Sequence, residues 1–368
     1  MTLKEIAAEL GVSYSTVSRV INNYNRNFSV RPELRKKILD KVEELHFTPD
    51  PVFSALRRRN NRQFAILLPG SVQILRNSGD QDSLYVLEKY LTAHHCYFEY
   101  LPFVDESAMN FRQPKWKAAG YILIDAIAPE QLSGVEKSNI PYVVLNGICG
   151  ENGTAIQCDD YGDMTALLEY LYQMKHWRIA YMCIKLPLHD TDERKSYDFG
   201  VSDYSKRYRL HHSSIPNRNN AYINFCRAHG MPELCDYVTT PEQLQECFDH
   251  YLAAGVTAFV GYNFKSGLAI MQELHKRGLD IPRQASVISF DDTEYNNFTI
   301  PALSSLAHPA LEMGKKAAQL IIRRSENNSY AKGKIFLLPG RIIERKSVCP
   351  PPHAFDETLR KRYLKHQF

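Results

Sequence analysis

Apolar side chains recur at helical spacing at the start of the chain. In the first segment the apolar residues are spaced three or four positions apart, at Leu3, Ile6, Ala7 and Leu10. This spacing predicts an amphipathic helix, and Thr2 with Glu5 has the spacing of a capping box. Gly11 predicts the end of this helix and a sharp turn, because glycine adopts the left-handed backbone that such endings use.

The same pattern predicts two more helices. The second is expected from about Tyr14 to Asn22, with Ser13 as its N-cap. Its inward face is formed by Val17, Val20 and Ile21. The third helix follows Pro32, a residue suited to a first helical turn. Its apolar stripe is formed by Leu34, Ile38, Val42 and Leu45. Three short helices with a tight glycine turn between the first two form a helix-turn-helix unit.

Hydroxyl groups crowd the start of the second helix, just ahead of Arg19. They belong to Ser13, Tyr14, Ser15, Thr16 and Ser18. Serine and threonine are mediocre helix formers, so stability alone does not explain them. In a helix-turn-helix unit the second helix lies in the DNA major groove, where hydroxyls approach phosphates and arginine bonds a guanine edge. The alternative is a solvated polar helix face.

The charge distribution favours the DNA interpretation. Residues 1–62 contain 12 Lys and Arg against 7 Asp and Glu, whereas the rest of the chain contains 33 against 34. All the excess positive charge of this +4 chain therefore lies in its first sixth. Such an asymmetry predicts an anionic polymer as the partner of the amino-terminal unit.

Beyond residue 62 the pattern changes to short apolar runs that alternate with amphipathic stretches. Six runs predict buried parallel strands, at 64–70, 120–125, 142–146, 178–184, 257–262 and 286–292. Helices are predicted between them at 82–93, 161–173 and 265–277. This alternation predicts a doubly wound α/β architecture, in which ligands bind beyond the carboxyl ends of the strands.

Composition excludes several other classes of protein. No apolar run reaches the ~18 residues that a membrane span requires, and the charged amino terminus lacks a signal core, so we expect a cytoplasmic protein. The eight cysteines are scattered and the thirteen histidines form no metal-binding array, which predicts no metal and no cofactor. The pair His211-His212 is interpreted as a surface pair. Phosphate-binding loops and nucleophile motifs are also missing from the sequence, so we predict no enzyme.

The helix-turn-helix segment resembles a known family. "TLKEIAAELGVSYSTVSRVINN", with "LRKKILDKVEELHFTPD" downstream, is similar to the headpiece of the lac repressor/gal repressor (LacI/GalR) family of bacterial transcription regulators. The resemblance implies phosphate contacts by Thr2, Ser13, Thr16, Ser18 and Asn22. It implies that bases are read by Tyr14, Ser15 and Arg19. It also implies paired copies of the chain, and therefore a homodimer on a near-palindromic operator.

The family's next element is a hinge helix that folds on operator DNA and inserts a leucine into the minor groove. "TPDPVFSALRRRN" stands in that place, and Leu56 matches the wedge. Pro51 and Phe53 depart from the family pattern, and Phe53 would crowd the paired hinges. The arginines at 57–59 either contact phosphates or form a solvated linker.

The resemblance continues more loosely through the α/β part. It implies two subdomains similar to periplasmic sugar-binding proteins, with a small-molecule effector between them. "TAFVGYNFKSGLAIMQELHKRGLDIPRQASVISFDD" is the nearest match, and it implies effector contacts by Asn263 and Asp291. "IPNRNNAYINF" places Arg218 at a third contact. Converging carboxylate, amide and guanidinium groups suit sugar hydroxyls. The alternatives are a capping role for Asp291 and a loop position for Arg218.

Asp159 is interpreted as a cap of the following helix, with an effector contact as the alternative. Departures from the family concentrate near the effector. Phe264 replaces the family's aspartate after the effector asparagine, and "SVQILRNSGDQDS" lacks the usual helix start. An extra run at 189–214 is either a lid or a surface insertion.

Together these observations predict an all-α headpiece (1–47), a hinge (48–62), a two-subdomain effector core (63–345) and a tail (346–368). The chain is expected to cross between the subdomains near 159–171, 291–308 and 336. The predicted function is a DNA-binding repressor whose operator affinity is changed by a sugar or sugar derivative. The alternative is a solute-binding protein without a regulatory role, which the basic amino-terminal unit disfavours.

Overall fold

The chain divides into two compact units, Met1–Asn61 and Arg62–Phe368. The computed structural model describes residues 3–21, 30–45, 62–68, 81–102, 114, 116–126, 129–184, 212–327 and 333–351. All of the predicted hinge except Arg62, and most of the predicted tail and insertion, lie outside these residues. Within the described part, no helix is long and apolar enough to cross a membrane. The predicted boundaries of the four segments remain a prediction.

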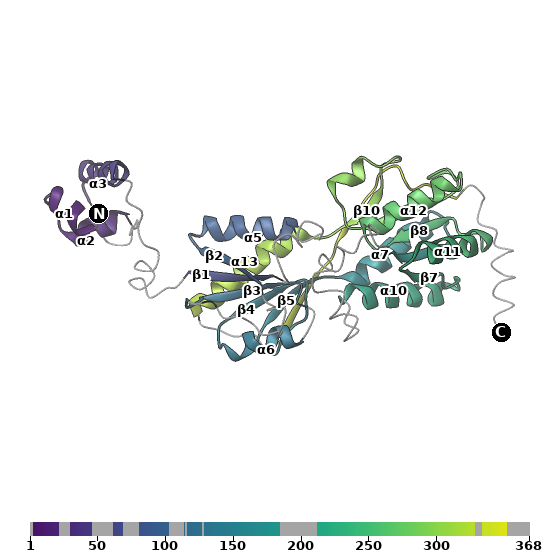
Figure 1. Cartoon of the computed structure of the whole chain (residues 1–368), viewed down its shortest axis with the longest axis horizontal. Helices are drawn as coiled ribbons and strands as arrows, with labels where there is room; N and C mark the ends of the chain where they lie inside the picture. Colours follow the sequence, from purple (N-terminus) through teal and green to yellow (C-terminus); the bar gives the residue numbers. More distant parts are fainter. Residues whose placement is uncertain are drawn as a thin grey trace. The chain divides into compact units, whose positions relative to one another are not determined.

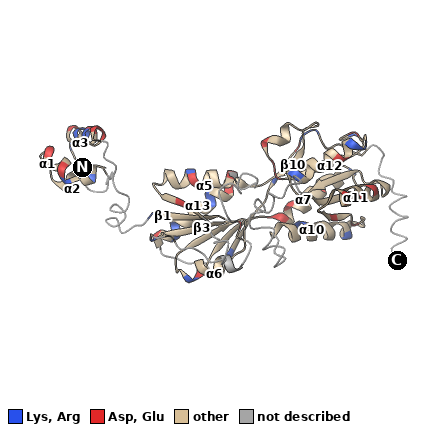
Figure 2. Cartoon of the chain, in the orientation of Figure 1, with Lys and Arg blue, Asp and Glu red and all other residues tan. Residues whose placement is uncertain are grey.

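The first unit is a three-helix headpiece made of α1 (Leu3–Glu9), α2 (Tyr14–Ile21) and α3 (Pro32–Glu44). Its core joins apolar side chains from all three helices, namely Ile6, Ala7, Val17, Val20 and Ile38. Gly11 has φ +62° between α1 and α2, as the sharp turn requires. Acidic and basic residues are mixed along α3 (Figure 2). The helices predicted from the apolar stripes are therefore confirmed.

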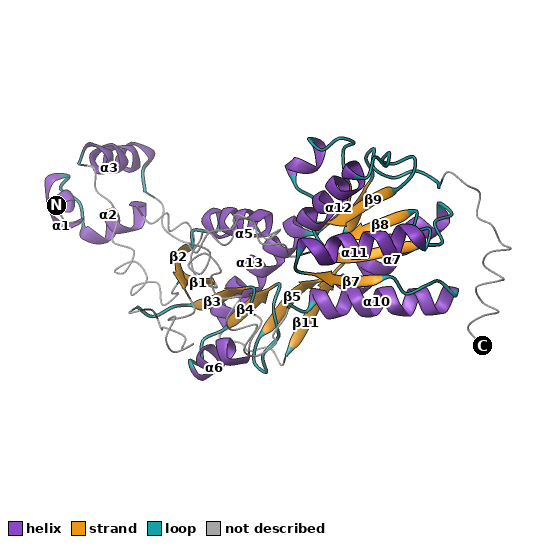
Figure 3. Cartoon of the chain, turned by 45° about the vertical axis from the view of Figure 1, so that its right-hand side comes forward, coloured by secondary structure: helices purple, strands orange, loops and turns teal. Residues whose placement is uncertain are grey.

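The second unit contains two six-stranded sheets, each flanked by helices (Figures 1 and 3). The first lobe has the strand order β11 (Lys334–Leu338), β5 (Thr154–Cys158), β4 (Tyr142–Leu145), β3 (Gly120–Ile124), β1 (Gln63–Leu68), β2 (Tyr97–Pro102). All of its pairings are parallel. Its helices are α5 (Gln81–Ala93), α6 (Pro129–Lys137) and α13 (Ala310–Asn327).

The second lobe has the strand order β12 (Arg341–Ile343), β10 (Ser304–Ala307), β9 (Ser286–Phe290), β8 (Ala258–Gly261), β6 (Ile179–Ile184), β7 (Cys235–Val238). Only the β10–β12 pairing is antiparallel among those described. Its helices are α7 (Asp160–Gln173), α10 (Ser214–His229), α11 (Pro241–Ala253) and α12 (Phe264–Lys276), with a short 3-10 helix, η2 (Glu294–Asn297).

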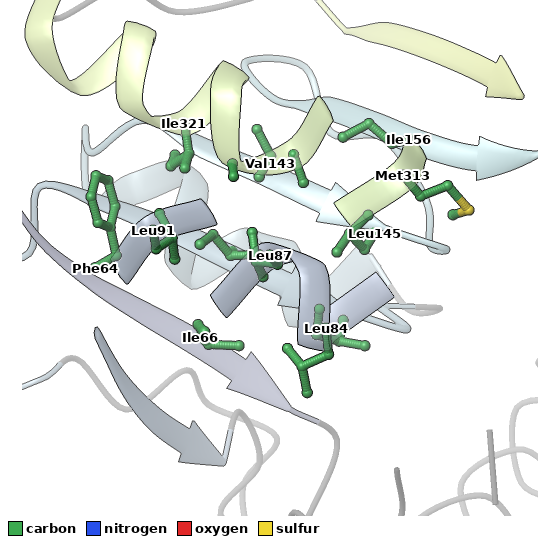
Figure 4. Packing of buried hydrophobic residues seen from close by; sticks show 14 of the residues in the cluster. Phe64, Ile66, Leu84, Leu87, Leu91, Val143, Leu145, Ile156, Met313 and Ile321 are labelled. Carbon is green, nitrogen blue, oxygen red and sulfur yellow. The ribbon is translucent and has the colours of Figure 1, made fainter. Parts of the chain in front are cut away.

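Each sheet is buried on both faces, which explains its nearly continuous apolar strands. In the first lobe, α5 and α13 pack on one face, where Leu87 and Ile321 meet strand residues such as Phe64 and Val143 (Figure 4). In the second lobe, α7 and α10 cover one face, and α11 and α12 cover the other. The doubly wound α/β fold is confirmed, and the six predicted strands lie within two residues of their expected ends.

The chain passes three times between the lobes. It leaves β5 at Cys158 and enters α7, which packs in the second lobe. It returns after β10 at His308 and enters α13, and it crosses again between β11 and β12 at residues 339–340. The first two crossings lie next to or within the ranges 159–171 and 291–308 expected from the sequence. The third lies a few residues beyond the expected position, 336. The carboxyl ends of β5, β10 and β11 thus meet the interlobe region.

Candidate DNA interface and interlobe site

The start of α2 forms the candidate DNA interface. Ser13 caps this helix, because its Oγ accepts a hydrogen bond from the backbone N–H of Thr16 at 3.1 Å. The same Oγ lies 2.7 Å from Ser15 Oγ and 2.8 Å from Thr16 Oγ1. Ser13, Ser15 and Arg19 are exposed, whereas Val17 on the opposite face is fully buried. The apolar face of α2 therefore packs in the headpiece core, which leaves the hydroxyl-rich face exposed to solvent.

Three of the predicted DNA contacts, Thr2, Asn22 and Leu56, lie outside the described residues. The remaining six lie in the loop before α2 and along α2 itself, namely Ser13, Tyr14, Ser15, Thr16, Ser18 and Arg19. Because these six residues are consecutive or nearly so at the start of α2, they can form one surface that contacts DNA. The predicted DNA-contacting role of all nine residues stays a prediction.

Residues that directly follow strands form the interlobe site. Asp125 follows β3, Asn146 follows β4 and Asp291 follows β9. All three have left-handed backbones, with φ of 50°, 53° and 66°. Asn and Asp tolerate this conformation better than other side-chain-bearing residues, and such outliers cluster at functional sites. The sheets therefore end in polar side chains on turned backbones.

A hydrogen-bonded chain links the two lobes at these strand ends. Asn146 donates from Nδ2 to Asp125 Oδ1 at 3.2 Å within the first lobe. The His212 Nε2–H donates to the backbone oxygen of Asn146 at 2.8 Å, and His212 Nδ1 lies 2.8 Å from Ser214 Oγ. Ser214 Oγ in turn lies 2.6 Å from the hydroxyl of Tyr262, which follows β8. His212 thus bridges the lobes, and its interpretation as a surface residue was wrong.

Arg218 lies in the second turn of α10 and forms a buried ion pair with Asp160. Nε and Nη2 of Arg218 each lie 2.7 Å from Asp160 Oδ1, and both side chains are 4% exposed. Nη1 donates to the Tyr262 backbone oxygen at 2.6 Å, and the guanidinium carbon lies 3.8 Å from the Phe290 ring centroid. Burial alone would lower the pKa of Arg218, but Asp160 raises it. The alternative loop position for Arg218 was wrong.

Asp291 is paired with His308. The Nε2–H of His308 donates to Asp291 Oδ1 at 2.6 Å, and the two side chains are 15% and 24% exposed. Burial alone would raise the pKa of Asp291, but the hydrogen bond and charge of His308 lower it. Burial alone would lower the pKa of His308, but Cys158 and Asp291 raise it well above its usual value. The pair is therefore charged at neutral pH.

The two other strand-end residues singled out from the sequence are helix caps. Asn263 Oδ1 accepts from the N–H of Ser266 at 2.9 Å and begins α12. Asp159 Oδ1 accepts from the N–H of Gly162 at 3.0 Å and begins α7, which confirms the capping prediction. The cap uses only the amide oxygen of Asn263, so the effector contact predicted for Asn263 stays a prediction.

The sequence missed Asp160, Tyr262 and His308 as members of this site. Each follows a strand end by one or two residues, which is the signal that places ligands in open α/β sheets. Asp292, the residue after Asp291, accepts hydrogen bonds from Arg345 and from Ser305, both at 2.6 Å. The adjacent carboxylates thus serve different partners.

Comparisons with known proteins agree with this geometry. Residues 2–50 match the family of bacterial regulatory proteins called lacI, and residues 168–348 match a periplasmic binding protein-like domain. The chain is similar to catabolite control protein A of Priestia megaterium, with 23% identity over 95% of this chain and 99% of that protein. It is similar to the ribose operon repressor of Bacillus subtilis (strain 168), with 25% identity over 94% of this chain and 98% of that protein.

The fold is that of a solved lac repressor dimer bound to operator and the anti-inducer ONPF. The TM-score is 0.70 with 18% identity, over 95% of this chain and 99% of that one. A helix-turn-helix headpiece followed by a two-lobed binding core defines a ligand-responsive transcription regulator. The chain resembles the LacI/GalR family of bacterial transcription regulators, both in its helix-turn-helix segment and along its whole length. The relatives named here are regulators rather than enzymes.

Proposed function

We propose that this protein is a homodimeric repressor whose affinity for a near-palindromic operator is set by a carbohydrate bound between its lobes. The observation that carries the proposal is one chain that joins an exposed hydroxyl-rich recognition helix to paired sheets ending in polar side chains. A binding core alone would not need the headpiece. A headpiece alone would not need the two lobes.

The DNA half of the proposal rests on α2. Arg19, Tyr14 and Ser15 read base edges, and Arg19 forms two hydrogen bonds to one guanine. The set Thr2, Ser13, Thr16, Ser18 and Asn22 contacts phosphates, and Leu56 enters the minor groove. Support comes from the exposure of Ser13, Ser15 and Arg19 on a helix whose other face is buried.

Dimerisation places two headpieces on a two-fold axis, which makes the operator near-palindromic. An exposed apolar patch beside η2 supports a second copy as its occupant. Tyr295, Phe298 and Ile300 expose 59%, 77% and 84% of their surface. Large apolar side chains gathered in this way are typical of a protein interface.

The effector half of the proposal rests on Arg218, Asn263 and Asp291. Three of the five N–H groups of Arg218 are engaged by Asp160 and Tyr262, so two remain for a ligand. Asn263 offers its amide nitrogen, and Asp291 offers the carboxylate oxygen that His308 leaves unused. Donors and acceptors side by side match vicinal sugar hydroxyls.

Effector binding is coupled to operator binding because the two lobes are joined by three chain crossings and by the His212–Asn146 hydrogen bond. An effector that favours one lobe arrangement changes the spacing of the hinges and therefore operator affinity. Effector and operator must alter each other's binding by the same factor.

The test has two stages. First, genomic fragments are selected on the full-length protein, and the enriched site is titrated by fluorescence anisotropy against a scrambled duplex of equal length. Second, the titration is repeated with ribose, other pentoses and hexoses, and their phosphates. The proposal predicts an enriched two-fold-related site and at least one sugar that changes its affinity. A sugar response without any preferred site would instead identify a solute-binding protein.

A further inference from the structure

We propose that Cys158 is a reactive thiol, activated by His308 and Asp291, which a small hydroperoxide oxidises at the crossing of the two lobes. The groups involved come from different crossings. Cys158 ends β5, His308 follows β10, and Asp163 in the first turn of α7 accepts from the N–H of Gly340 at 2.8 Å. We call Cys158, Asp163, Asp291 and His308 the crossing cluster.

The crossing cluster contains the three parts of an activated nucleophile. Asp291 orients His308 through the 2.6 Å hydrogen bond to Nε2, which directs Nδ1 away from the carboxylate. That Nδ1 is buried and makes no well-aligned hydrogen bond. The Cys158 side chain lies close enough to this imidazole to raise the pKa of His308. Activated cysteine nucleophiles have this arrangement, in which a thiol lies next to a base and the base is oriented by a carboxylate.

Charge favours the thiolate at this position. An electrostatic attraction acts equally on both partners, so an imidazolium that Cys158 helps to stabilise in turn stabilises its thiolate. The Cys158 thiol also donates to Met313 Sδ at 3.6 Å. Because a thioether sulfur is a weak acceptor, this hydrogen bond does little to hold the proton on the thiol. Burial opposes ionisation, since Cys158 is 6% exposed. The imidazolium supplies the opposing attraction.

A second observation indicates a bound partner. Asp163 is 3% exposed, and its Oδ2 is buried without a hydrogen bond. Burial raises the pKa of Asp163 to about 6, and the charge of His308 acts against that rise, which places the two groups near each other. An acceptor at Asp163 and a donor at His308 suit one O–H group. No set of three such side chains among the described residues is arranged for a metal ion.

The other cysteines provide an internal contrast. Cys96 has the same 6% exposure as Cys158. Burial raises the pKa of Cys96 to about 11, which removes almost all thiolate at neutral pH. The pKa values of Cys226 and Cys235 are likewise raised, to about 11 and about 12. Cys96 is therefore a matched control for reactivity at equal exposure.

The chemical step balances without a further reagent. The Cys158 thiolate attacks one oxygen of the hydroperoxide, so the S–O bond forms as the O–O bond breaks. The sulfur is oxidised by two electrons to a sulfenic acid, and the peroxide is reduced to water or an alcohol. The leaving oxygen takes its proton from Nδ1 of His308. Added oxygen at Cys158 then crowds His308 and Met313, which lie on the return path into α13.

The first experiment measures thiol reactivity on the full-length protein and needs no DNA. Iodoacetamide labelling between pH 5 and pH 9 is quantified for each cysteine by peptide mass spectrometry. We expect Cys158 to react about tenfold or more faster than Cys96 at pH 7, with a rate that falls less steeply towards low pH. His308→Gln should remove the excess at Cys158 and leave Cys96 unchanged. Equal rates for the two cysteines, or an unchanged rate in the variant, would overturn the proposal.

The second experiment uses hydrogen peroxide with dimedone, which traps sulfenic acids. The adduct is expected at Cys158 and is expected to be lost in His308→Gln; an adduct distributed evenly over the cysteines would overturn the assignment. Should His308→Gln fail to fold, the wild-type pH profile of Cys158 against Cys96 decides alone. An effect of peroxide on operator affinity rests on the proposed function, whereas the labelling pattern does not, so the two can fail separately.

Discussion

Nε of Arg218 donates to Oδ1 of Asp160 at 2.7 Å, and neither side chain exposes more than 4% of its surface. This ion pair joins the first residue of α7 to the second turn of α10. The guanidinium also holds the Tyr262 backbone oxygen and stacks on Phe290. The ion pair therefore holds in place the residues next to the proposed effector site.

Removing one partner of this pair should be costly. Asp160→Ala leaves a buried guanidinium without its carboxylate, and we expect a loss of about 3–5 kcal/mol in the free energy of unfolding. Urea denaturation followed by circular dichroism measures the change. The control is Glu233→Ala, which breaks the solvent-exposed pair with Arg227 (40% and 67% exposed) and should cost much less stability than Asp160→Ala. Equal losses in both variants would contradict the assigned role of the pair.

Much of the fold was predictable because its signals are local. The apolar stripe of α3 and the continuous runs of β1 and β9 each fix an element without reference to distant residues. Short strands such as β7 (Cys235–Val238) were missed, because its exposed Asp236 and Tyr237 interrupt the apolar pattern. Its place at the sheet edge allows such residues.

The candidate site was less predictable, because its members meet only through tertiary structure. Asp291 was found from its position at a strand end. His308 lies 17 residues further on, and nothing near it in the sequence indicates a pairing with Asp291. His212 likewise reaches Asn146 across 66 residues, so its bridging role depends on how the lobes pack. Pairing across such separations has no local pattern.

His176 should make stability depend on acid pH. It is 1% exposed, with Nδ1 2.9 Å from Thr257 Oγ1 and Nε2 2.9 Å from the Cys349 backbone oxygen. Burial lowers the pKa of His176 to about 4. The unfolded chain therefore binds the proton first, and stability is lost as pH falls from about 6.5 towards 4, by about 3 kcal/mol.

The measurement compares urea unfolding of wild type and His176→Gln at several pH values between 4 and 7.5. The difference between the two proteins isolates His176. This is necessary because burial raises the pKa of Asp163 to about 6, so that Asp163 contributes with the opposite sign. Wild type should lose more stability than His176→Gln over this window. Parallel curves would show that His176 does not titrate as expected.

The apolar patch beside η2 predicts the dimer interface. Phe298→Glu places a charge on a side chain that is 77% exposed in the single chain, so its cost should appear mainly on association. We expect the dimer dissociation constant to rise about tenfold or more, measured by sedimentation velocity across a concentration series. Tyr237→Glu, at an exposed aromatic on the edge strand β7, is the control and should leave association unchanged. An unchanged dimer in Phe298→Glu would move the interface elsewhere.

The most direct test of the account is operator binding by Arg19→Ala beside Arg35→Ala. Both arginines are part of the headpiece, but Arg19 lies on α2, whereas Arg35 lies on α3. On the selected operator, Arg19→Ala should weaken binding about tenfold or more while binding to scrambled DNA changes little, because a lost base contact costs ~1–3 kcal/mol. Arg35→Ala should preserve the preference for the operator over scrambled duplex. An Arg19→Ala protein that discriminates between the two duplexes as well as wild type would contradict the assignment of α2 as the reading helix.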